Sequence, residues 1–155
     1  MKIELCGGNG KIYVDLVSIS LHISQFFYTF AAMKSYKIEF FDDSQSPDLE
    51  KRREGSHFWI TADDSDDEPH LSFNKNNWGN KVDYLFSEDG FVETIRSVKG
   101  DDLKLLMRLC ENAATVEQTA DYLYKRFSPD GYKAYSYILE WLEENHIKTS
   151  FWSWP

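Results

Sequence analysis

The sequence has few of the residues on which covalent cross-links, metal sites and nucleophilic catalysis depend. Its 155 residues include two cysteines, Cys6 and Cys110, which lie far apart and form no CxxC pair. A disulfide framework and a cysteine-based zinc site are therefore excluded, and free thiols suit a reducing compartment. The four histidines show no HxxxH or HxxEH spacing. We expect neither a metal ion nor another cofactor.

Motifs for phosphate binding, nucleophilic attack and calcium binding are missing as well. The glycine-rich segment 7–10 lacks the Lys-Ser/Thr ending and the following helix of a P-loop, and we interpret it as a turn. No GxSxG elbow occurs. Counted from Asp63, a calcium loop would need glycine where Glu68 stands. The sequence therefore favours a binding protein over an enzyme, with acid/base catalysis by clustered carboxylates as an alternative.

One long stretch, 16–33, contains no Asp, Glu, Lys or Arg. Its 18 residues approach the length of a membrane-spanning helix. However, it carries serine, histidine, glutamine and threonine side chains that are too polar for hydrocarbon, and it follows two predicted strands rather than opening the chain as a signal peptide does. We expect a soluble, cytoplasmic protein without a membrane partner.

Alternating apolar and polar residues, separated by turn signals, predict a mainly antiparallel β-sheet over residues 1–98. Two long polar loops, 42–55 and 63–69, interrupt it. Residues 17–33 fit a strand by their alternation and a helix by their 3.6-residue stripe, and both alternatives stay open. The expected strands are 2–6, 11–16, 36–41, 57–62, 81–87 and 91–98.

After Gly100 the periodicity becomes helical, and we expect about three helices over residues 101–148. Asp101 or Asp102 is the predicted cap of the first helix, Thr115 with Gln118 forms a capping box for the second, and Ser128-Pro129 opens the third. A short aromatic tail, 151–155, follows. Strands followed by a run of helices predict a single α+β domain over 1–155.

The negative charge is concentrated in one part of the chain. Residues 42–68 hold ten acidic and three basic groups, which is −7 of a net charge of −9. The two loops in this region are joined by one predicted strand, and we expect them at the same rim of the sheet or at adjacent ends. A solvated surface that keeps the protein soluble is one interpretation, and steering of a basic partner is the other. The candidate partner-binding residues are Asp42, Asp43, Asp63, Asp64, Asp66, Asp67 and Glu68, flanked by His70 and Trp78.

This small, acidic profile without a catalytic motif resembles bacterial toxin-immunity proteins, including those of contact-dependent growth inhibition. The resemblance implies a cytoplasmic protein that binds and neutralises a cognate toxin, often a basic nuclease. A net charge of −2 over residues 115–148 argues against direct nucleic-acid binding by the helices. Alternatives are a nucleic-acid mimic and an adaptor domain that docks through the aromatic tail. The oligomeric state stays open.

Overall fold

The structure, a computed structural model, describes residues 2–7, 10–15, 35–65, 67–79, 82 and 90–154. They belong to two compact units, Met1–Lys34 and Ser35–Pro155. In the first unit, strands β1 (Lys2–Gly7) and β2 (Gly10–Asp15) form the predicted antiparallel hairpin. The ambiguous element at 17–33 and, apart from residue 82, the predicted strand 81–87 fall outside the described residues. The expectation of one domain for the whole chain stays a prediction.

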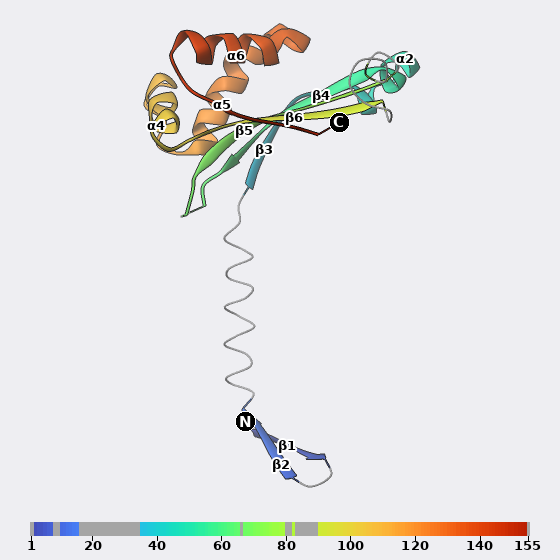
Figure 1. Cartoon of the computed structure of the whole chain (residues 1–155), viewed down its shortest axis with the longest axis vertical. Coiled ribbons are helices and arrows are strands. Elements are labelled where there is room, and N and C mark those ends of the chain that lie inside the picture. The colour runs from blue at the N-terminus through green and yellow to red at the C-terminus, as the bar shows by residue number, and fades with distance from the viewer. Residues whose placement is uncertain are drawn as a thin grey trace. The chain divides into compact units, whose positions relative to one another are not determined.

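The second unit contains a five-stranded antiparallel sheet in the order β3-β4-β5-β6-β7 (Figure 1). Four strands follow one another along the chain, whereas the fifth returns after the helices and pairs with β6. The predicted mainly antiparallel sheet is therefore confirmed. The strands are β3 (Ser35–Asp42), β4 (Gly55–Asp63), β5 (His70–Trp78), β6 (Phe91–Lys99) and β7 (Ser150–Trp154).

Three longer helices pack on one face of this sheet, and the predicted α+β class is confirmed (Figure 1). The connection between β3 and β4 adds a short 3-10 helix and a short α-helix. Among the helices of the described residues, none is long and apolar enough to cross a membrane. The helices are η1 (Asp43–Gln45), α2 (Leu49–Arg53), α4 (Gly100–Leu109), α5 (Val116–Phe127), η2 (Ser128–Lys133) and α6 (Ala134–Glu144).

Two strands, β5 and β7, were not predicted from the sequence, and β7 lies in the segment that was interpreted as an aromatic tail. The β5 segment is rich in asparagine, which is depleted in strands. Leu71 and Phe73 are nevertheless completely buried on its helix side, and β5 pairs along its whole length with β4 and β6. Packing and pairing on both sides therefore override the weak local propensity.

The predicted N-cap of α5, Thr115, is confirmed, whereas the return bond of the capping box goes to Ala114 rather than to Thr115. The backbone N–H of Gln118 donates to Thr115 Oγ1 at 3.1 Å, and Gln118 Oε1 accepts from the N–H of Ala114 at 2.9 Å. The predicted cap of α4 was wrong, because Lys99 occupies the N-cap without a side-chain bond. Asp102 lies in the first turn instead and accepts the N–H of Lys148 at 3.0 Å.

The predicted start of the third helix at Ser128-Pro129 also needs correction. That pair opens the 3-10 helix η2, whose N-cap is Phe127, and α6 begins only at Ala134. Gly131, with φ of 57°, breaks the helical path inside η2. A positive φ costs glycine little, so this position allows the chain to turn between α5 and α6.

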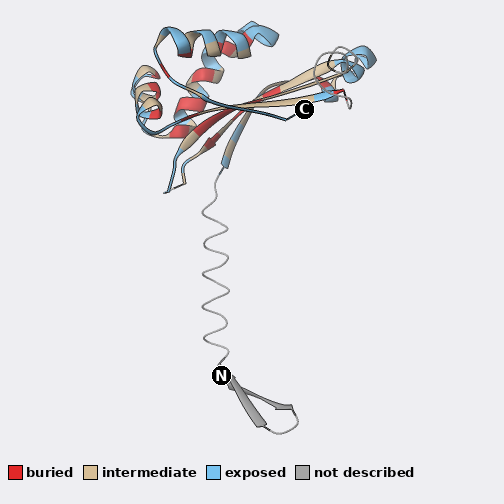
Figure 2. Cartoon of the chain, viewed as in Figure 1, coloured by how far each residue is buried: buried red, intermediate tan, exposed pale blue. Residues whose placement is uncertain are grey.

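The core lies between the sheet and the helices, where Figure 2 shows the buried residues gathered. Phe58, Ile60 and Ala62 alternate along β4 and are completely buried. Leu106, Leu123, Ile138 and Leu142 face them from the helices. Full burial of one such side chain contributes about 1.5–3 kcal/mol. Cys110 is also buried, and desolvation raises the pKa of its thiol to about 12, so it has no nucleophilic character near neutral pH.

Candidate functional site

The two acidic loops lie at opposite ends of strand β4, not at one rim as expected (Figure 1). The first loop leads into Gly55, and the second begins at Asp63, the last residue of the nine-residue strand. At about 3.3 Å per residue, the two ends are roughly 26 Å apart. The expectation was wrong because a single strand necessarily carries its two flanking loops to opposite edges of the sheet. The acidic residues therefore form two surfaces rather than one.

At the first end, Asp43 belongs to the interior of the fold. Its side chain is 6% exposed, and its two oxygens accept the hydroxyl of Tyr132 at 2.5 Å and the backbone N–H of Ser56 at 3.0 Å. Asp42 accepts the N–H and hydroxyl of Ser44 at 2.9 and 2.6 Å and caps η1. Asp43 is therefore not available for contact with a partner.

Trp78 also has an internal role at this end. It stands opposite Gly55 in the β4–β5 register, and its indole N–H donates to the backbone oxygen of Arg52 at 3.0 Å. The side chain is half-buried on strand β5, whereas the sequence placed Trp78 outside the expected strands and among the candidate partner contacts. A β-carbon on Gly55 would come within 2.9 Å of the Trp78 ring, so glycine permits this close approach. Trp78 thus holds α2 against the sheet.

The net charge of the two ends differs. Residues 42–54 contain five acidic groups and three basic ones, Lys51, Arg52 and Arg53, for a net of −2. Residues 63–68 contain five acidic groups and no basic one, for a net of −5. We call this second segment the acidic hairpin, because it connects β4 to β5. The negative potential is therefore concentrated at the acidic hairpin.

Local hydrogen bonds shape the acidic hairpin. Asp63 Oδ1 accepts the N–H of Ser65 at 2.9 Å, and His70 Nδ1 lies 3.1 Å from the backbone oxygen of Glu68. Glu68 forms an ion pair with Lys99 at 2.8 Å, and the hydrogen bond from that ammonium holds the pKa of Glu68 below its usual range. Within the described part of the hairpin, this is the one ion pair that offsets the charge.

The described acidic residues of the hairpin thus lie close together in the chain, and most of them have exposed side chains. Asp64 and Asp67 are exposed. Asp66 lies outside the described residues. His70 stands opposite Asp63 in the β4–β5 register and beside Lys99 on β6, so it borders the hairpin as expected.

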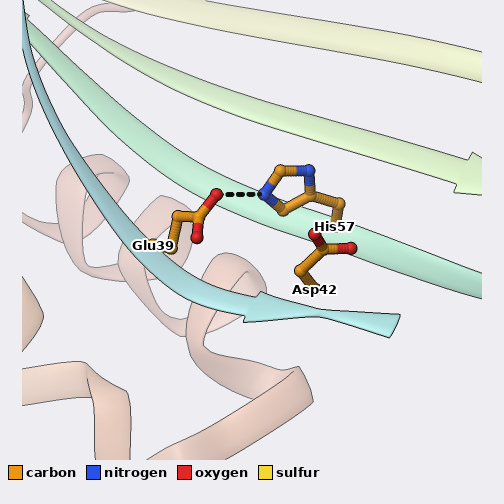
Figure 3. A group of neighbouring side chains, drawn as sticks. All are labelled: Glu39, Asp42 and His57. Carbon is orange, nitrogen blue, oxygen red and sulfur yellow. Dashed lines mark hydrogen bonds and ion pairs between the residues drawn. The ribbon is translucent and has the colours of Figure 1, made fainter. Parts of the chain in front are cut away.

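A second polar group, Glu39, Asp42 and His57, was not predicted from the sequence (Figure 3). One ligand-type atom from each residue lies within 4.8 Å of the others, and His57 Nε2 is 3.1 Å from Glu39 Oε1. A β-bulge assembles the group, because the β3–β4 register shifts between Glu39 and Phe41. Phe40 and Phe41 then both contact Phe58 in the core, while Asp42 stands directly opposite His57.

Nearby charges show how this polar group is satisfied. Lys37 Nζ lies 2.7 Å from Glu39 Oε1 and 4.9 Å from the Trp59 ring centre, and the His57 ring lies 4.2 Å from that of Trp59. The hydrogen bond from Lys37 lowers the pKa of Glu39, with further help from His57, although burial opposes the shift. Burial also raises the pKa of Asp42, but the hydrogen bonds from Ser44 and the nearby positive charges outweigh it and give a net lowering.

Carboxylate and imidazole groups are ligands that divalent cations use, so these three residues have the right chemistry to hold one. A cation bound there would have to displace the Lys37 ammonium from Glu39. The arrangement is explained by two contacts of Glu39 on the helix-free face of the sheet, one with Lys37 on the same strand and one with His57 across the strand pair. Spacing in the sequence gave no signal for it, because the group depends on the register and on the bulge.

A cleft of about 710 Å³ opens beside the C-terminal end of α6. Its charged lining combines Arg96 and Lys148 with Glu140 and Glu143. Arg96 also donates to Thr149 Oγ1 at 3.2 Å. Because both signs of charge line the cleft, it does not favour a ligand of one charge.

Comparisons of the chain with models of protein families, with curated proteins and with solved structures found no match. Inferences about function therefore depend on the charge and geometry of this chain.

Proposed function

We propose that the chain is an immunity-type binding protein that neutralises a cognate basic toxin through the acidic hairpin. The observation that carries the proposal is the placement of five acidic residues within 63–68, at the turn of a hairpin, with one described ion pair to offset them. Compared with the set expected from the sequence, Asp43 and Trp78 no longer contribute, and Asp42 belongs to the opposite end of the sheet. The contacts proposed here are Asp63, Asp64, Asp66, Asp67 and Glu68, with His70 beside them.

Clustered like charges repel one another and destabilise a compact state, and a protein that needs only solubility avoids this cost by dispersing its charge. A concentrated negative tip, in contrast, steers a positively charged partner and raises the association rate. The hairpin joins two nine-residue strands inside the sheet, so its ends are held in place before a partner arrives. Such preorganisation reduces the entropy lost on binding.

The same charge distribution disfavours a nucleic-acid mimic. A mimic presents carboxylates in place of phosphates and needs an extended, evenly spaced acidic surface. Here the acidic residues divide into a hairpin of −5 and an opposite end of −2. A basic toxin with a compact positive site, such as the phosphate-binding surface of a nuclease, fits the hairpin better.

The test is a pair of matched charge reversals. One variant combines Asp64→Lys with Asp67→Lys in the acidic hairpin. The control combines Glu140→Lys with Glu144→Lys on α6, where both side chains are also exposed. Both variants change the net charge from −9 to −5, so they differ in the position of the charge and not in its amount. Circular dichroism checks that both remain folded.

The assay begins with cross-linking in the chain's own cells and identification of the proteins retained by the unchanged chain. Expression of the identified protein alone should arrest growth, and co-expression of the unchanged chain or the α6 control should restore it. For the hairpin variant we expect no rescue and an association rate about tenfold lower or more, with a weaker dependence on salt. A partner that is neither basic nor toxic, or equal association rates for the two variants, would refute the proposal.

A further inference from the structure

Strand β7 forms one edge of the sheet and exposes three large aromatic side chains. Phe151, Trp152 and Trp154 are 59%, 48% and 62% exposed. Trp152 continues a row of register partners, Ile95 and Asn74, on the face away from the helices. Phe151 points to the other face, where Arg96 lies over its ring at 4.8 Å. Both faces of this edge strand are therefore apolar.

The opposite edge of the same sheet, β3, is built differently. It carries the charged residues Lys37 and Glu39 and a β-bulge at Phe40. Edge charges and bulges are devices that prevent a strand from pairing with another chain. Strand β7 has no charged residue, and its register with β6 is continuous from Ser150 to Trp154. Along the described residues, no strand pairs with its outer side. Only one edge of the sheet is thus protected against pairing.

We propose that β7 pairs with β7 of a second copy of this chain, antiparallel about a twofold axis at Trp152, to form a ten-stranded sheet across the dimer. In this register, large side chains of one copy of the strand lie opposite small side chains of the other copy, except at the axis. Trp152 meets its own copy at the axis, Ser150 lies opposite Trp154, and Phe151 lies opposite Ser153. Each large ring away from the axis therefore faces a small serine, and paired residues point to the same face of the joined sheet.

The charge distribution is compatible with a second copy of the chain at β7. Each chain carries −9, but the paired strands are neutral. The acidic hairpin connects β4 and β5, and five strand spacings of about 4.8 Å separate the two copies of β5 across the dimer. This is roughly 24 Å, more than twice the Debye length of about 8 Å at physiological salt. Antiparallel pairing also places the two hairpins at opposite ends of the joined sheet.

The exposed aromatic area is suitable for a reversible dimer. Aromatic side chains bury roughly 150–250 Å² each, so the three exposed fractions correspond to roughly 250–420 Å² per chain. Two copies would bury roughly 500–850 Å² from these rings alone, against about 1,200 Å² for the smallest standard interfaces. Backbone pairing and the neighbouring surface add to this area. We expect a dissociation constant on the order of 10 µM.

Sedimentation equilibrium of the purified chain, from about 1 µM to about 200 µM, tests association directly. We expect a monomer at the low end of the range and a dimer at the high end. Trp152→Lys places two ammonium groups opposite each other at the axis and should leave a monomer throughout, with an unchanged circular dichroism spectrum. A wild-type chain that stays monomeric at the high concentration refutes the proposal. The same result is expected if β7 pairs with a segment of another protein instead of a second copy.

Disulfide trapping tests the register. In a Cys6→Ser background, Trp152→Cys should form a covalent dimer under mild oxidation, because directly opposed residues have Cα atoms about 4.5–5.5 Å apart, within disulfide range. The matched control is Trp154→Cys, which is on the same face and similarly exposed. Its two copies would be offset by four residues, or roughly 13 Å, beyond reach. We expect at least tenfold faster trapping for Trp152→Cys, and equal rates contradict the proposed pairing. These experiments need no toxin, so their outcome is independent of the proposed function.

Discussion

The buried carboxylate of Asp43 links the sheet to the helical layer, and its removal should cost stability rather than binding. It accepts from Ser56 at the start of β4 and from Tyr132 in η2, 89 residues further along the chain. The Tyr132 ring also packs on Phe41 with centres 4.7 Å apart. We therefore compare Asp43→Ala, Asp43→Asn and Tyr132→Phe.

The structure predicts a graded effect for the three substitutions. A hydrogen bond to a charged group contributes about 1.5–3 kcal/mol, so Asp43→Ala, which removes two, should cost about 3 kcal/mol at the low end of that range. Tyr132→Phe removes one bond and should cost about 1.5 kcal/mol, since the bond from Ser56 remains. Asp43→Asn should cost about 1 kcal/mol, because the amide can accept from Ser56 and donate to the tyrosine oxygen, keeping two neutral bonds.

Urea unfolding followed by tryptophan fluorescence measures these differences. With an m-value of about 2 kcal/mol/M, the midpoint for Asp43→Ala should fall by about 1.5 M. In the double variant Asp43→Ala with Tyr132→Phe, the costs should not add, because both substitutions remove the same bond. A loss below about 0.5 kcal/mol for Asp43→Ala, or equal costs for alanine and asparagine, would show that these bonds do not hold the layers together.

Two further predictions concern the pH dependence of stability. Burial lowers the pKa of Lys75, whose ammonium lies 5.0 Å from the Tyr135 ring, so the charged form of this side chain opposes folding. Relative to Lys75→Met, the free energy of unfolding of the wild type should therefore increase as the pH rises from about 7 to about 10. A difference between the two proteins that stays constant over this pH range contradicts the prediction. The pKa of Glu39 is lowered by Lys37, so its contribution is present above roughly pH 4–5 and is lost as the pH falls below that range. Because half of this side chain is exposed, Glu39→Gln should cost about 0.5 kcal/mol at pH 7 and nothing near pH 2, measured by thermal unfolding at each pH.

The elements predicted correctly are those whose signals are local. Alternation identified β3, β4 and β6, and the capping box of Thr115 and Gln118 placed the start of α5 at the right residue. Strand β5 was missed because it depends on pairing with both neighbours, which no local window contains. The separation of the two acidic loops was available from the sequence, since one strand joins them.

The roles of individual side chains depended on contacts from distant parts of the chain. An aspartate in a polar segment is expected at the surface, but hydrogen bonds from the N–H of Ser56 and the hydroxyl of Tyr132 allow Asp43 to be buried. Trp78 likewise follows asparagines that are typical of a loop, yet its indole contacts Arg52, 26 residues earlier. The group of Glu39, Asp42 and His57 requires the bulge, whose position no motif marks.

The late return of β7 has a consequence for how the chain folds during synthesis. Ser150 bonds to Ser97, a residue made 53 positions earlier. At about 5–20 residues per second, the outer edge of β6 waits roughly 3–10 s for its partner strand to be made. During that interval a neighbouring nascent chain can offer its own β7 to the bare edge, which is the route to a domain-swapped product. Slow initiation of translation spaces the ribosomes widely along the message and so keeps neighbouring nascent chains apart. We therefore expect it to favour pairing of β6 with β7 of the same chain.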